Sequence, residues 1–337
     1  MKKEREYDKK YSVALVGATG LVGQTFLRVL EELRFPVKEL KLFASEKSKG
    51  KKILAFGRDY TLKNITDDSV EKTDIAFFST DAETSGKITP IFLNAGALVI
   101  DNSSFHRTNP KIPLIVPEVN LNAYNGERII ANPNCSTIQA VLPLSALSEY
   151  GILSVNYTTY QAVSGSGKNG ISDLKRTLNG KNGEYYPYNI SKNCIPQIGG
   201  NGGFYGYTEE EVKMINETKK ILGLKDLPVS ATCVRVPVEN CHAVSVRAEL
   251  EKEFDIDKII QELSDTEGVE VLDDLDHDIF PVQELADGKD IVFVGRIRRD
   301  LSAKNGLIFY TVADNLRKGA ATNAVQTALG LIKANKI

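Results

Sequence analysis

The sequence of 337 residues contains no stretch long and apolar enough to span a bilayer. Its first segment, Met1–Asp8, lacks the apolar core of a signal peptide, so we interpret it as a short frayed lead-in and expect a cytoplasmic protein. The formal net charge of −2 gives no reason to expect nucleic acid or an anionic membrane as a partner. The chain also has no internal repeat and no low-complexity linker.

The spacings typical of metal sites are also missing. The three histidines are scattered at positions 106, 242 and 277, and no two cysteines form a C-x-x-C pair, so we expect no metal ion. The four cysteines lie at positions 135, 194, 233 and 241. A chain of this size without an export signal is not expected to form disulfides.

A glycine-rich turn near the N-terminus predicts a dinucleotide-binding site. Ser12–Val16 is predicted to be a buried strand, Gly17–Gly23 follows with the spacing G-x-x-G-x-x-G, and an amphipathic helix comes next. In this arrangement Gly17 allows the tight turn, Gly20 lets the backbone approach a pyrophosphate, and Gly23 lets helix and strand pack closely. The alternative is a strand–helix turn that binds no ligand.

The residues after the second predicted strand, Leu40–Ala44, bear on which dinucleotide binds. An NAD site would place an acidic residue at the end of that strand to hold the ribose hydroxyls. This chain has the hydroxyls of Ser45 and Ser48 and the ammonium of Lys47, which suit a 2′-phosphate and favour NADP. Glu46 argues for a limited preference, because a carboxylate aimed at the ribose would favour NAD. The alternative is a solvated basic loop.

The most informative residue is Cys135, in the segment Asn132–Thr137 directly before the apolar helical run Ile138–Tyr150. The unpaired N–H groups and the positive dipole end of a helix N-terminus favour thiolate over thiol. A thiolate is a nucleophile and can carry a covalent acyl group. The alternative is a small buried hydrophobic residue. The turn residues before Cys135 and the dinucleotide signature upstream favour catalysis.

The pattern of predicted strands and helices changes halfway along the chain. The first half alternates strand and helix, which is typical of a parallel sheet with right-handed crossovers. Its predicted strands are Ser12–Val16, Leu40–Ala44, Ile75–Ser79, Leu98–Asp101 and Arg128–Ala131. The second half has longer alternating strands at Leu153–Val163, Val229–Val238, Ala243–Leu250 and Ile291–Ile297, with helices at Glu209–Leu222 and Ile256–Ser264.

These patterns predict an α/β fold. We expect an N-terminal Rossmann-type dinucleotide-binding domain, residues 1–135 plus 315–337, and a second α+β domain, residues 136–314, built on a mostly antiparallel sheet. The final helical segment, Gly319–Lys336, is expected to pack back against the first domain, because the sheet of that domain needs a cover.

Charged residues of the second half fit a small anionic substrate. Arg235 lies near the end of one predicted strand and His242 opens the next, an arrangement that can present both side chains at one sheet edge. An imidazole is the acid and base that a thiol nucleophile needs, and a guanidinium offers a fork for a carboxylate. The alternatives are a structural histidine and a surface ion pair. Glu210 and Lys213 share a face of a predicted helix, where the alternative is a simple surface pair.

Two loops complete the set of candidate segments. Asp101–Arg107 follows a parallel strand, where α/β proteins form their ligand crevice. Gln161–Gly167 ends a strand in a glycine-rich turn, which we expect to reach the cofactor or the substrate.

Motifs along essentially the whole chain resemble those of the aspartate-semialdehyde dehydrogenase family. They are G-A-T-G-L-V-G at 17–23, D-N-S-S-F-H-R at 101–107, V-P-E-V-N at 116–120, N-P-N-C-S-T-I-Q at 132–139, Y-Q-A-V-S-G-S-G at 160–167, E-E-V-K at 210–213, C-V-R-V-P-V at 233–238 with His242, and D-N-L-R-K-G-A-A at 314–321. Several of these motifs in order are highly specific, whereas any one of them alone would not be.

The resemblance implies a reaction and a role for each candidate residue. The reaction is the reversible, NADP-dependent reductive dephosphorylation of L-4-aspartyl phosphate to L-aspartate 4-semialdehyde, which leads to lysine, threonine and methionine. Cys135 would form the thioester and His242 would be the acid/base. Gln161, Glu210 and Arg235 would hold the substrate, while Arg107 and Lys213 would bind phosphate.

The resemblance also implies the cofactor-binding residues and the assembly. The expected NADP contacts are Gly17, Thr19, Gly20, Leu21, Val22, Ser45, Glu46, Lys47, Ser48, Ser164, Gly165 and Asn315, the last three near the nicotinamide. The expected partners are the small-molecule substrates and further copies of the chain, in a homodimer or homotetramer.

Other functions stay open on the sequence alone. N-acetyl-glutamyl-phosphate reductase and glyceraldehyde-3-phosphate dehydrogenase share the cofactor domain, the thioester cysteine and the acyl-phosphate chemistry. Glu210 argues against the first, because an acetylated amine carries no ammonium group for it to bind. A non-catalytic NADP-binding regulator is an alternative from another class, and a rapidly reacting thiol at Cys135 would argue against it.

Overall fold

The structure, a computed structural model, describes residues 9–66 and 69–337, so the predicted lead-in at Met1–Asp8 lies outside the described residues. The chain divides into two compact units. The first contains the described part of residues 1–113 with Asn122–Asn132 and Ala324–Ile337; the second contains Leu114–Leu121 and Pro133–Asn323. The contacts thus place residues 133–135 and 315–323 in the second unit, and the functional domain boundaries drawn from the sequence stay a prediction.

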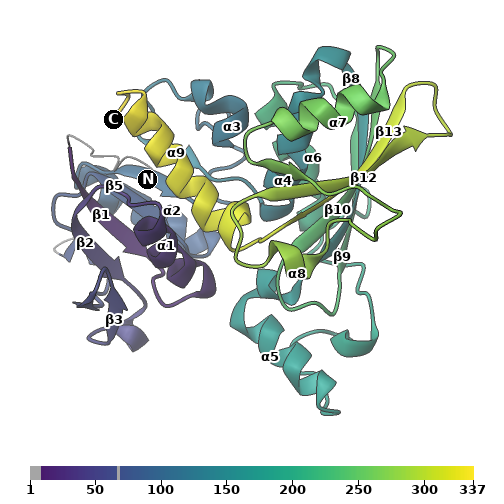
Figure 1. Cartoon of the computed structure of the whole chain (residues 1–337). Coiled ribbons are helices and arrows are strands. Elements are labelled where there is room, and N and C mark those ends of the chain that lie inside the picture. The colour runs from purple at the N-terminus through teal and green to yellow at the C-terminus, as the bar shows by residue number, and fades with distance from the viewer. Residues whose placement is uncertain (1–8, 67–68) are drawn as a thin grey trace. The chain divides into compact units, whose positions relative to one another are not determined.

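The first unit is built on a parallel five-stranded sheet in the order β2-β1-β5-β6-β7. Figure 1 labels its strands β1, β2 and β5. Its strands are β1 (Tyr11–Val16), β2 (Val37–Phe43), β5 (Ile75–Phe78), β6 (Leu98–Asp101) and β7 (Ile129–Ala131). Every residue of β1, β5 and β6 is buried, as expected when both faces of a parallel sheet are covered. All five strands predicted for this half are present, which confirms the parallel α/β sheet.

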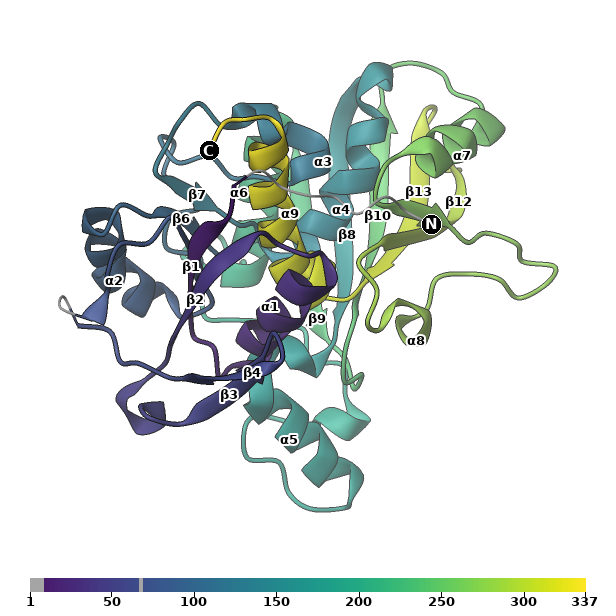
Figure 2. The same ribbon diagram turned by 60° about the vertical axis from the view of Figure 1, so that its left-hand side comes forward.

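Helices α1 (Leu21–Glu32), α2 (Ala82–Asn94) and most of α9 (Thr322–Lys333) belong to this unit. Residues 324–337 lie in this unit, where the Tyr11 hydroxyl donates a hydrogen bond to the Ile337 carbonyl at 3.1 Å. A small hairpin, β3 (Lys52–Ala55) and β4 (Arg58–Thr61), lies beside β2 (Figure 2) and was not predicted.

The second unit is built on a six-stranded sheet in the order β11-β12-β13-β10-β8-β9. The strands are β8 (Ile152–Gln161), β9 (Val229–Arg235), β10 (His242–Leu250), β11 (Val269–Val271), β12 (Val292–Asp300) and β13 (Gly306–Ala313). Three pairings are antiparallel, and β8–β9 and β11–β12 are parallel. The predicted mostly antiparallel sheet is confirmed, although the sequence analysis missed β11 and β13.

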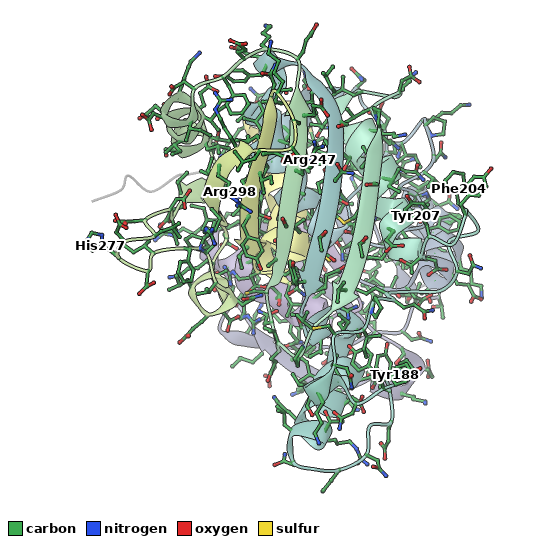
Figure 3. The ribbon with its side chains drawn as sticks, turned by 90° about the vertical axis from the view of Figure 1, so that its right-hand side faces the viewer. Tyr188, Phe204, Tyr207, Arg247, His277 and Arg298 are labelled. Carbon is green, nitrogen blue, oxygen red and sulfur yellow. The ribbon has the colours of Figure 1, made fainter. Side chains whose placement is uncertain are left out.

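One face of this sheet is covered by helices α4 (Cys135–Ala146), α6 (Glu209–Leu222) and α7 (Ile256–Asp265). Leu142 of α4, Met214 of α6 and Ile259 of α7 pack with the inward side chains of β10 in one hydrophobic core. The residues of β10 that alternate with these inward side chains point to the other face of the sheet, which is more exposed to solvent. Figure 3 shows Arg247 on that face. The predicted period-two pattern of this strand is therefore confirmed.

The remaining helices of the second unit are shorter or peripheral. They are α3 (Pro117–Asn120), α5 (Gly167–Leu178) and α8 (Gln283–Ala286), and a π-helical turn at Arg317–Ala321 precedes α9. Among the described residues, no helix combines the length and the apolar character needed to cross a membrane.

Candidate active site

Cys135 is the first residue of α4 and is partly exposed. Asn134 caps this helix, because its Oδ1 accepts hydrogen bonds from the backbone N–H groups of Ser136 at 3.0 Å and Thr137 at 3.1 Å. The helix begins three residues before the predicted run at Ile138, so Cys135 lies inside the first turn and is not itself the cap. The thiol is therefore held at the positive end of the helix dipole.

Two carboxylates of α6 hold Asn134 in place. Glu217 Oε2 accepts the backbone N–H of Asn134 at 2.6 Å, and Glu210 Oε1 accepts its side-chain Nδ2–H at 2.8 Å. Both glutamates are buried and lie seven residues apart, on the same face of the helix. Asn134, the cap of the cysteine-bearing helix, is thus fixed by the hydrogen bonds that it donates to a second helix.

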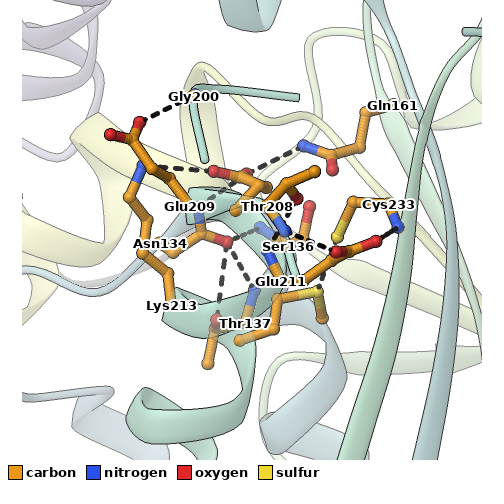
Figure 4. A network of polar contacts seen from close by, with 12 residues as sticks. Asn134, Ser136, Thr137, Gln161, Gly200, Thr208, Glu209, Glu211, Lys213 and Cys233 are labelled. Carbon is orange, nitrogen blue, oxygen red and sulfur yellow. Dashed lines mark hydrogen bonds and ion pairs between the residues drawn. The ribbon is translucent and has the colours of Figure 1, made fainter. Parts of the chain in front are cut away.

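The sequence of α6 explains why this helix starts where it does. Thr208 and Glu211 form a capping box, in which the Thr208 hydroxyl accepts the Glu211 N–H at 3.4 Å and Glu211 Oε2 accepts the Thr208 N–H at 2.8 Å. Glu211 Oε1 also accepts the backbone N–H of Cys233 in β9, at 3.0 Å. Figure 4 shows these contacts, which fix the helix start against the sheet.

Glu210 is the centre of the polar network. Besides Asn134, it accepts a hydrogen bond from Gln161 Nε2 at 3.0 Å and forms an ion pair with Lys213 at 3.4 Å. Burial alone would raise the pKa of Glu210, but the charge of Lys213 and the hydrogen bonds from Asn134 and Gln161 outweigh it and lower the pKa. The carboxylate is therefore kept ionised inside the protein, with Gln161 and Lys213 beside it.

His242 and Arg235 meet at the backbone of Ala162, where β8 ends. His242 Nδ1 accepts the Ala162 N–H at 3.0 Å, and Arg235 Nη1 donates to the Ala162 carbonyl at 2.6 Å. Burial, and then the charge of Arg235, lower the pKa of His242 to about 3. Because Nδ1 accepts, the neutral ring carries its proton on Nε2, which is buried and has no hydrogen-bond partner among the described residues.

The turn after β8 packs directly on this pair. A Cβ at Gly165 would lie 2.9 Å from Arg235 Nη1 and 3.2 Å from His242 Nε2, so only glycine leaves both groups room. Next to it, the Ser164 hydroxyl accepts a hydrogen bond from Asn315 Nδ2 at 2.9 Å. Asn315 Oδ1 in turn accepts the Cys241 N–H at 3.0 Å, so the predicted turn and Asn315 are joined beside His242.

In the first unit, backbone shape defines the predicted dinucleotide turn. Gly17 has φ +79°, and a Cβ there would lie 2.0 Å from the Ser79 carbonyl oxygen. A Cβ at Gly23 would lie 2.1 Å from the Gly17 carbonyl oxygen, which leaves no room for a side chain. Gly20 caps α1, whose first turn contains no acidic residue, and Thr19, Leu21 and Val22 are all partly exposed there.

The loop predicted to select the cofactor follows β2. Glu46–Ser48 forms a single 3-10 turn, and Ser45 and Lys47 are exposed. The Glu46 carboxylate pairs with Lys49 at 3.5 Å and accepts a hydrogen bond from Asn64 Nδ2. Its charge is thus partly engaged by neighbours in the loop.

Arg107 also lies in the first unit, in the turn after β6. It is buried, and its Nη2 donates a hydrogen bond to the Asn102 carbonyl at 2.7 Å. The adjacent His106 contacts the Thr89 hydroxyl at 3.1 Å, and burial lowers its pKa, as expected of a structural histidine.

The other cysteines differ from Cys135 in their surroundings. Burial raises the pKa of the Cys233 and Cys241 thiols, whereas Cys194 is exposed and outside any helix start. Cys241 lies with Asp287 and Asp314 in a group whose ligand atoms are within 4.8 Å of one another. Asn240 Nδ2 donates hydrogen bonds to both carboxylates of this group, and the predicted absence of a metal stays a prediction.

Sequence reasoning missed two residues of this site, Asn134 and Glu217. Asn134 could have been found as a cap, because asparagine before an apolar helical run is a common helix start. Glu217 could not, because its contact with Asn134 depends on how α6 packs beside α4.

Comparison with known proteins decides the family. Two domain families match, "Semialdehyde dehydrogenase, NAD binding domain" over residues 12–126 and "Semialdehyde dehydrogenase, dimerisation domain" over residues 143–318. Aspartate-semialdehyde dehydrogenase of Aquifex aeolicus is 46% identical and the alignment covers 97% of this chain and 99% of the relative; that of Bacillus subtilis is 43% identical over 96% and 98%. The chain belongs to the aspartate-semialdehyde dehydrogenase family.

Solved structures of the family agree with this assignment. The crystal structure of aspartate semialdehyde dehydrogenase II from Vibrio cholerae superimposes with a TM-score of 0.91 at 44% identity, over 96% of this chain and 99% of that one. The Candida albicans enzyme with NADP superimposes with a TM-score of 0.76 at 26% identity, over 98% and 100%. The predicted family, fold class and aspartate-semialdehyde dehydrogenase activity, in aspartate-family amino-acid biosynthesis, are confirmed. The second unit carries a dimerisation domain of the family.

Proposed function

We propose that this chain reduces L-4-aspartyl phosphate to L-aspartate 4-semialdehyde and phosphate through a thioester on Cys135, with NADPH as the reductant. The observation that carries the proposal is a continuous polar network in the second unit. It runs from the cap of the Cys135 helix through Glu210 to Gln161, and the next residue, Ala162, binds both His242 and Arg235. The nucleophile, the hydrogen-bond donor and the anion-binding group are thereby held by one network.

The cofactor is NADP, as for other aspartate-semialdehyde dehydrogenases. The first unit fits a dinucleotide, because Gly17 and Gly23 have no side chain where the turn and α1 approach each other closely, and the first turn of α1 carries no acidic residue. When bound, NADPH supplies the hydride. We propose that Gly17, Thr19, Gly20, Leu21 and Val22 contact its pyrophosphate half, Ser45–Ser48 its 2′-phosphate, and Ser164, Gly165 and Asn315 its nicotinamide half.

The chemistry on Cys135 proceeds in two stages. Its thiolate attacks the acyl-phosphate carbonyl, the carbon–oxygen bond to phosphate breaks, and a thioester remains. After hydride reaches the thioester carbonyl, the C–S bond breaks, the aldehyde leaves and the thiolate returns. The positive dipole end of α4 would favour the negative charge that develops on the reacting oxygen in both stages.

We assign to His242 the role of a hydrogen-bond donor to the reacting oxygen. Its Nδ1 is occupied by the Ala162 N–H, so its Nε2–H is the group available to the reacting oxygen. A neutral imidazole with this tautomer stabilises an oxyanion by donating a hydrogen bond. To take a proton from Cys135 it would first have to change tautomer, so the helix N-terminus is the better source of thiolate in this chain.

Substrate binding follows from the charges around the network. Arg235 offers its guanidinium to the α-carboxylate, and Glu210 and Gln161 receive the ammonium group. The ionised Glu210 favours an amine over an acetylated amine, which separates this activity from that of N-acetyl-glutamyl-phosphate reductase. Arg107 and Lys213 are proposed to bind the phosphate.

We propose a homodimer or homotetramer in which the second unit supplies the contact. The match to a dimerisation domain over residues 143–318 and the open face of its sheet support this assembly. The predicted functional domains, residues 1–135 plus 315–337 and residues 136–314, and the cytoplasmic location stay predictions of the sequence.

The reverse reaction tests the activity most simply. With NADP⁺, phosphate and L-aspartate 4-semialdehyde, we expect NADPH formation that requires all three. Succinic semialdehyde should be a poor substrate, because it has no ammonium group for Glu210 to bind. Equal rates with and without phosphate, or with an N-acetylated substrate, would refute the proposal.

A further inference from the structure

The turn between β13 and α9 has an unusual hydrogen-bond register. In the π-helical segment Arg317–Ala321, the N–H groups of Gly319 and Ala321 donate to the carbonyls of Asp314 and Leu316, five residues earlier, at 3.0 and 3.2 Å. A π turn is less favourable than an α turn and occurs often at functional sites. Its surroundings must therefore hold it in this register.

Three buried anchors do so from within the second unit. Asp314 Oδ1 caps the turn by accepting the N–H of Leu316 at 2.8 Å and of Arg317 at 3.1 Å. The guanidinium of Arg317 donates two hydrogen bonds to the carboxylate of Asp290, at 2.9 and 2.8 Å.

The third anchor is an ion pair between Lys318 and Glu118 of α3. The side chain of Lys318 is 0% exposed and its Nζ lies 2.6 and 2.8 Å from the two carboxylate oxygens. A charge so buried is tolerated only when paired and hydrogen-bonded.

The anchored turn presses the backbone of Gly319 against Cys135. A Cβ at Gly319 would lie 2.9 Å from Cys135 Cβ and 3.4 Å from its Cα. Neither atom is the free end of a flexible side chain, so neither can move aside without moving the nucleophile. Glycine is needed here for close approach alone.

We propose that Gly319 is a positioning residue. The anchored π turn holds the Gly319 backbone in contact with Cys135 and thereby fixes the position of the Cys135 side chain. The inference rests on the proposed role of Cys135 as nucleophile. The proposal explains the π turn, because the turn places Gly319, which follows the fully buried Lys318, in van der Waals contact with the reacting residue.

The test is the variant Gly319→Ala, compared with wild type in the full-length enzyme. The added methyl should displace Cys135, so we expect kcat to fall at least about tenfold while KM for the semialdehyde changes less than about threefold. The rate of Cys135 alkylation by iodoacetamide should fall in parallel with kcat. A wild-type kcat together with a wild-type alkylation rate would overturn the proposal.

Gly306→Ala is the matched control, because it adds a clash of similar kind elsewhere in the unit. Gly306 is the first residue of β13, and a Cβ there would lie 2.6 Å from Asp300 Cβ. This variant should lower Tm while leaving Cys135 alkylation unchanged. If it slowed alkylation as much as Gly319→Ala, the effect would be one of general stability and the proposal would be wrong. Failure of the proposed function would instead appear in the wild type, as absent turnover.

A double variant decides the matter if Gly319→Ala does not fold. In Cys135→Gly the Cβ that would clash is gone, so adding Gly319→Ala should leave Tm close to that of Cys135→Gly alone. Recovery of folding in this background supports the contact. A double variant that unfolds as readily as Gly319→Ala contradicts it.

Discussion

In the first unit the predicted dinucleotide turn is defined by the shape of the backbone, whereas in the second unit the candidate residues are held by side-chain hydrogen bonds. Gly17 and Gly23 have no room for a side chain, and the loop at Ser45–Ser48 is largely exposed. Around Glu210, by contrast, polar atoms are buried and paired with one another. We infer that the dinucleotide turn of the first unit completes its interactions only when a ligand binds, whereas the polar groups around Glu210 in the second unit are already paired before the substrate binds.

The comparison implies that one side-chain change should stop the reaction without weakening the binding of NADP, and Cys135→Ala is that change. We expect loss of at least about 10⁴-fold in kcat, because no other group can carry the acyl chain. NADP binding, measured by calorimetry, should stay within about twofold of wild type, since the Gly17–Gly23 turn belongs to the other unit. Cys194→Ala, at an exposed cysteine, should keep full activity. A Cys135→Ala enzyme that failed to bind NADP would show that cofactor binding and the chemistry on Cys135 are not independent.

Lys318→Met should show how much the second unit depends on its buried pairs. The change leaves the Glu118 carboxylate buried without its cation, so we expect a loss of about 3–5 kcal/mol in the free energy of unfolding. Denaturant titration measures it. The exposed pair of Lys87 and Glu83 in the first unit provides the contrast, and Lys87→Met should leave the denaturation midpoint unchanged.

Arg235→Leu should weaken use of the semialdehyde. The guanidinium is buried beside His242, so removing it should cost about 2–5 kcal/mol in kcat/KM for the semialdehyde. Arg107→Leu and Lys213→Met should instead raise the apparent KM for phosphate. If Arg107→Leu left the phosphate dependence unchanged, that assignment would be wrong.

The buried histidine makes the second unit sensitive to acid. The pKa of His242 is lowered to about 3, below the ordinary value of 6.5, so between these values the unfolded chain binds a proton that the folded chain does not. Its contribution to stability is therefore present above pH 6.5 and is lost as pH falls, by about 2 kcal/mol between pH 7 and pH 5. Denaturation midpoints of wild type and His242→Gln across this range measure it. The two should converge towards pH 5; a constant difference would argue against a neutral buried ring.

The smallest effect is expected at the cofactor loop. In the proposed cofactor site the exposed Glu46 would repel the 2′-phosphate, so Glu46→Gln should increase the preference for NADP over NAD by about two- to fivefold. The ratio of kcat/KM for the two cofactors measures it. A wild-type enzyme with no preference, or with a preference for NAD, would refute the interpretation of Ser45 and Lys47.

The sequence predicted the secondary structure well where periodicity was strong. The predicted helix Glu209–Leu222 has the same bounds as α6, and the alternation of β10 matches its buried and exposed faces. The hairpin β3–β4 was missed because each of its strands has only four residues, too few to show a clear period. Strand β13 was missed although Leu307–Val312 is rich in β-branched and aromatic residues, so a propensity signal was present there.

For the candidate site, the sequence pointed to the groups that are proposed to react but not to the residues that hold them. Cys135, Arg235 and His242 stand out by type and local context. Glu217 and Gly319 act through neighbours more than eighty residues away, and such contacts depend on packing that no local pattern encodes. The π turn is likewise defined by anchors at Asp290 and Glu118, far from it in sequence.

The central claim, a covalent intermediate on Cys135, is tested most directly by mass spectrometry of the enzyme mixed with aspartyl phosphate in the absence of NADPH. Digestion and peptide mapping should place one acyl adduct on Cys135, and adding NADPH should remove it with release of the semialdehyde. An adduct on Cys194, Cys233 or Cys241, or turnover with no adduct at Cys135, would contradict the account.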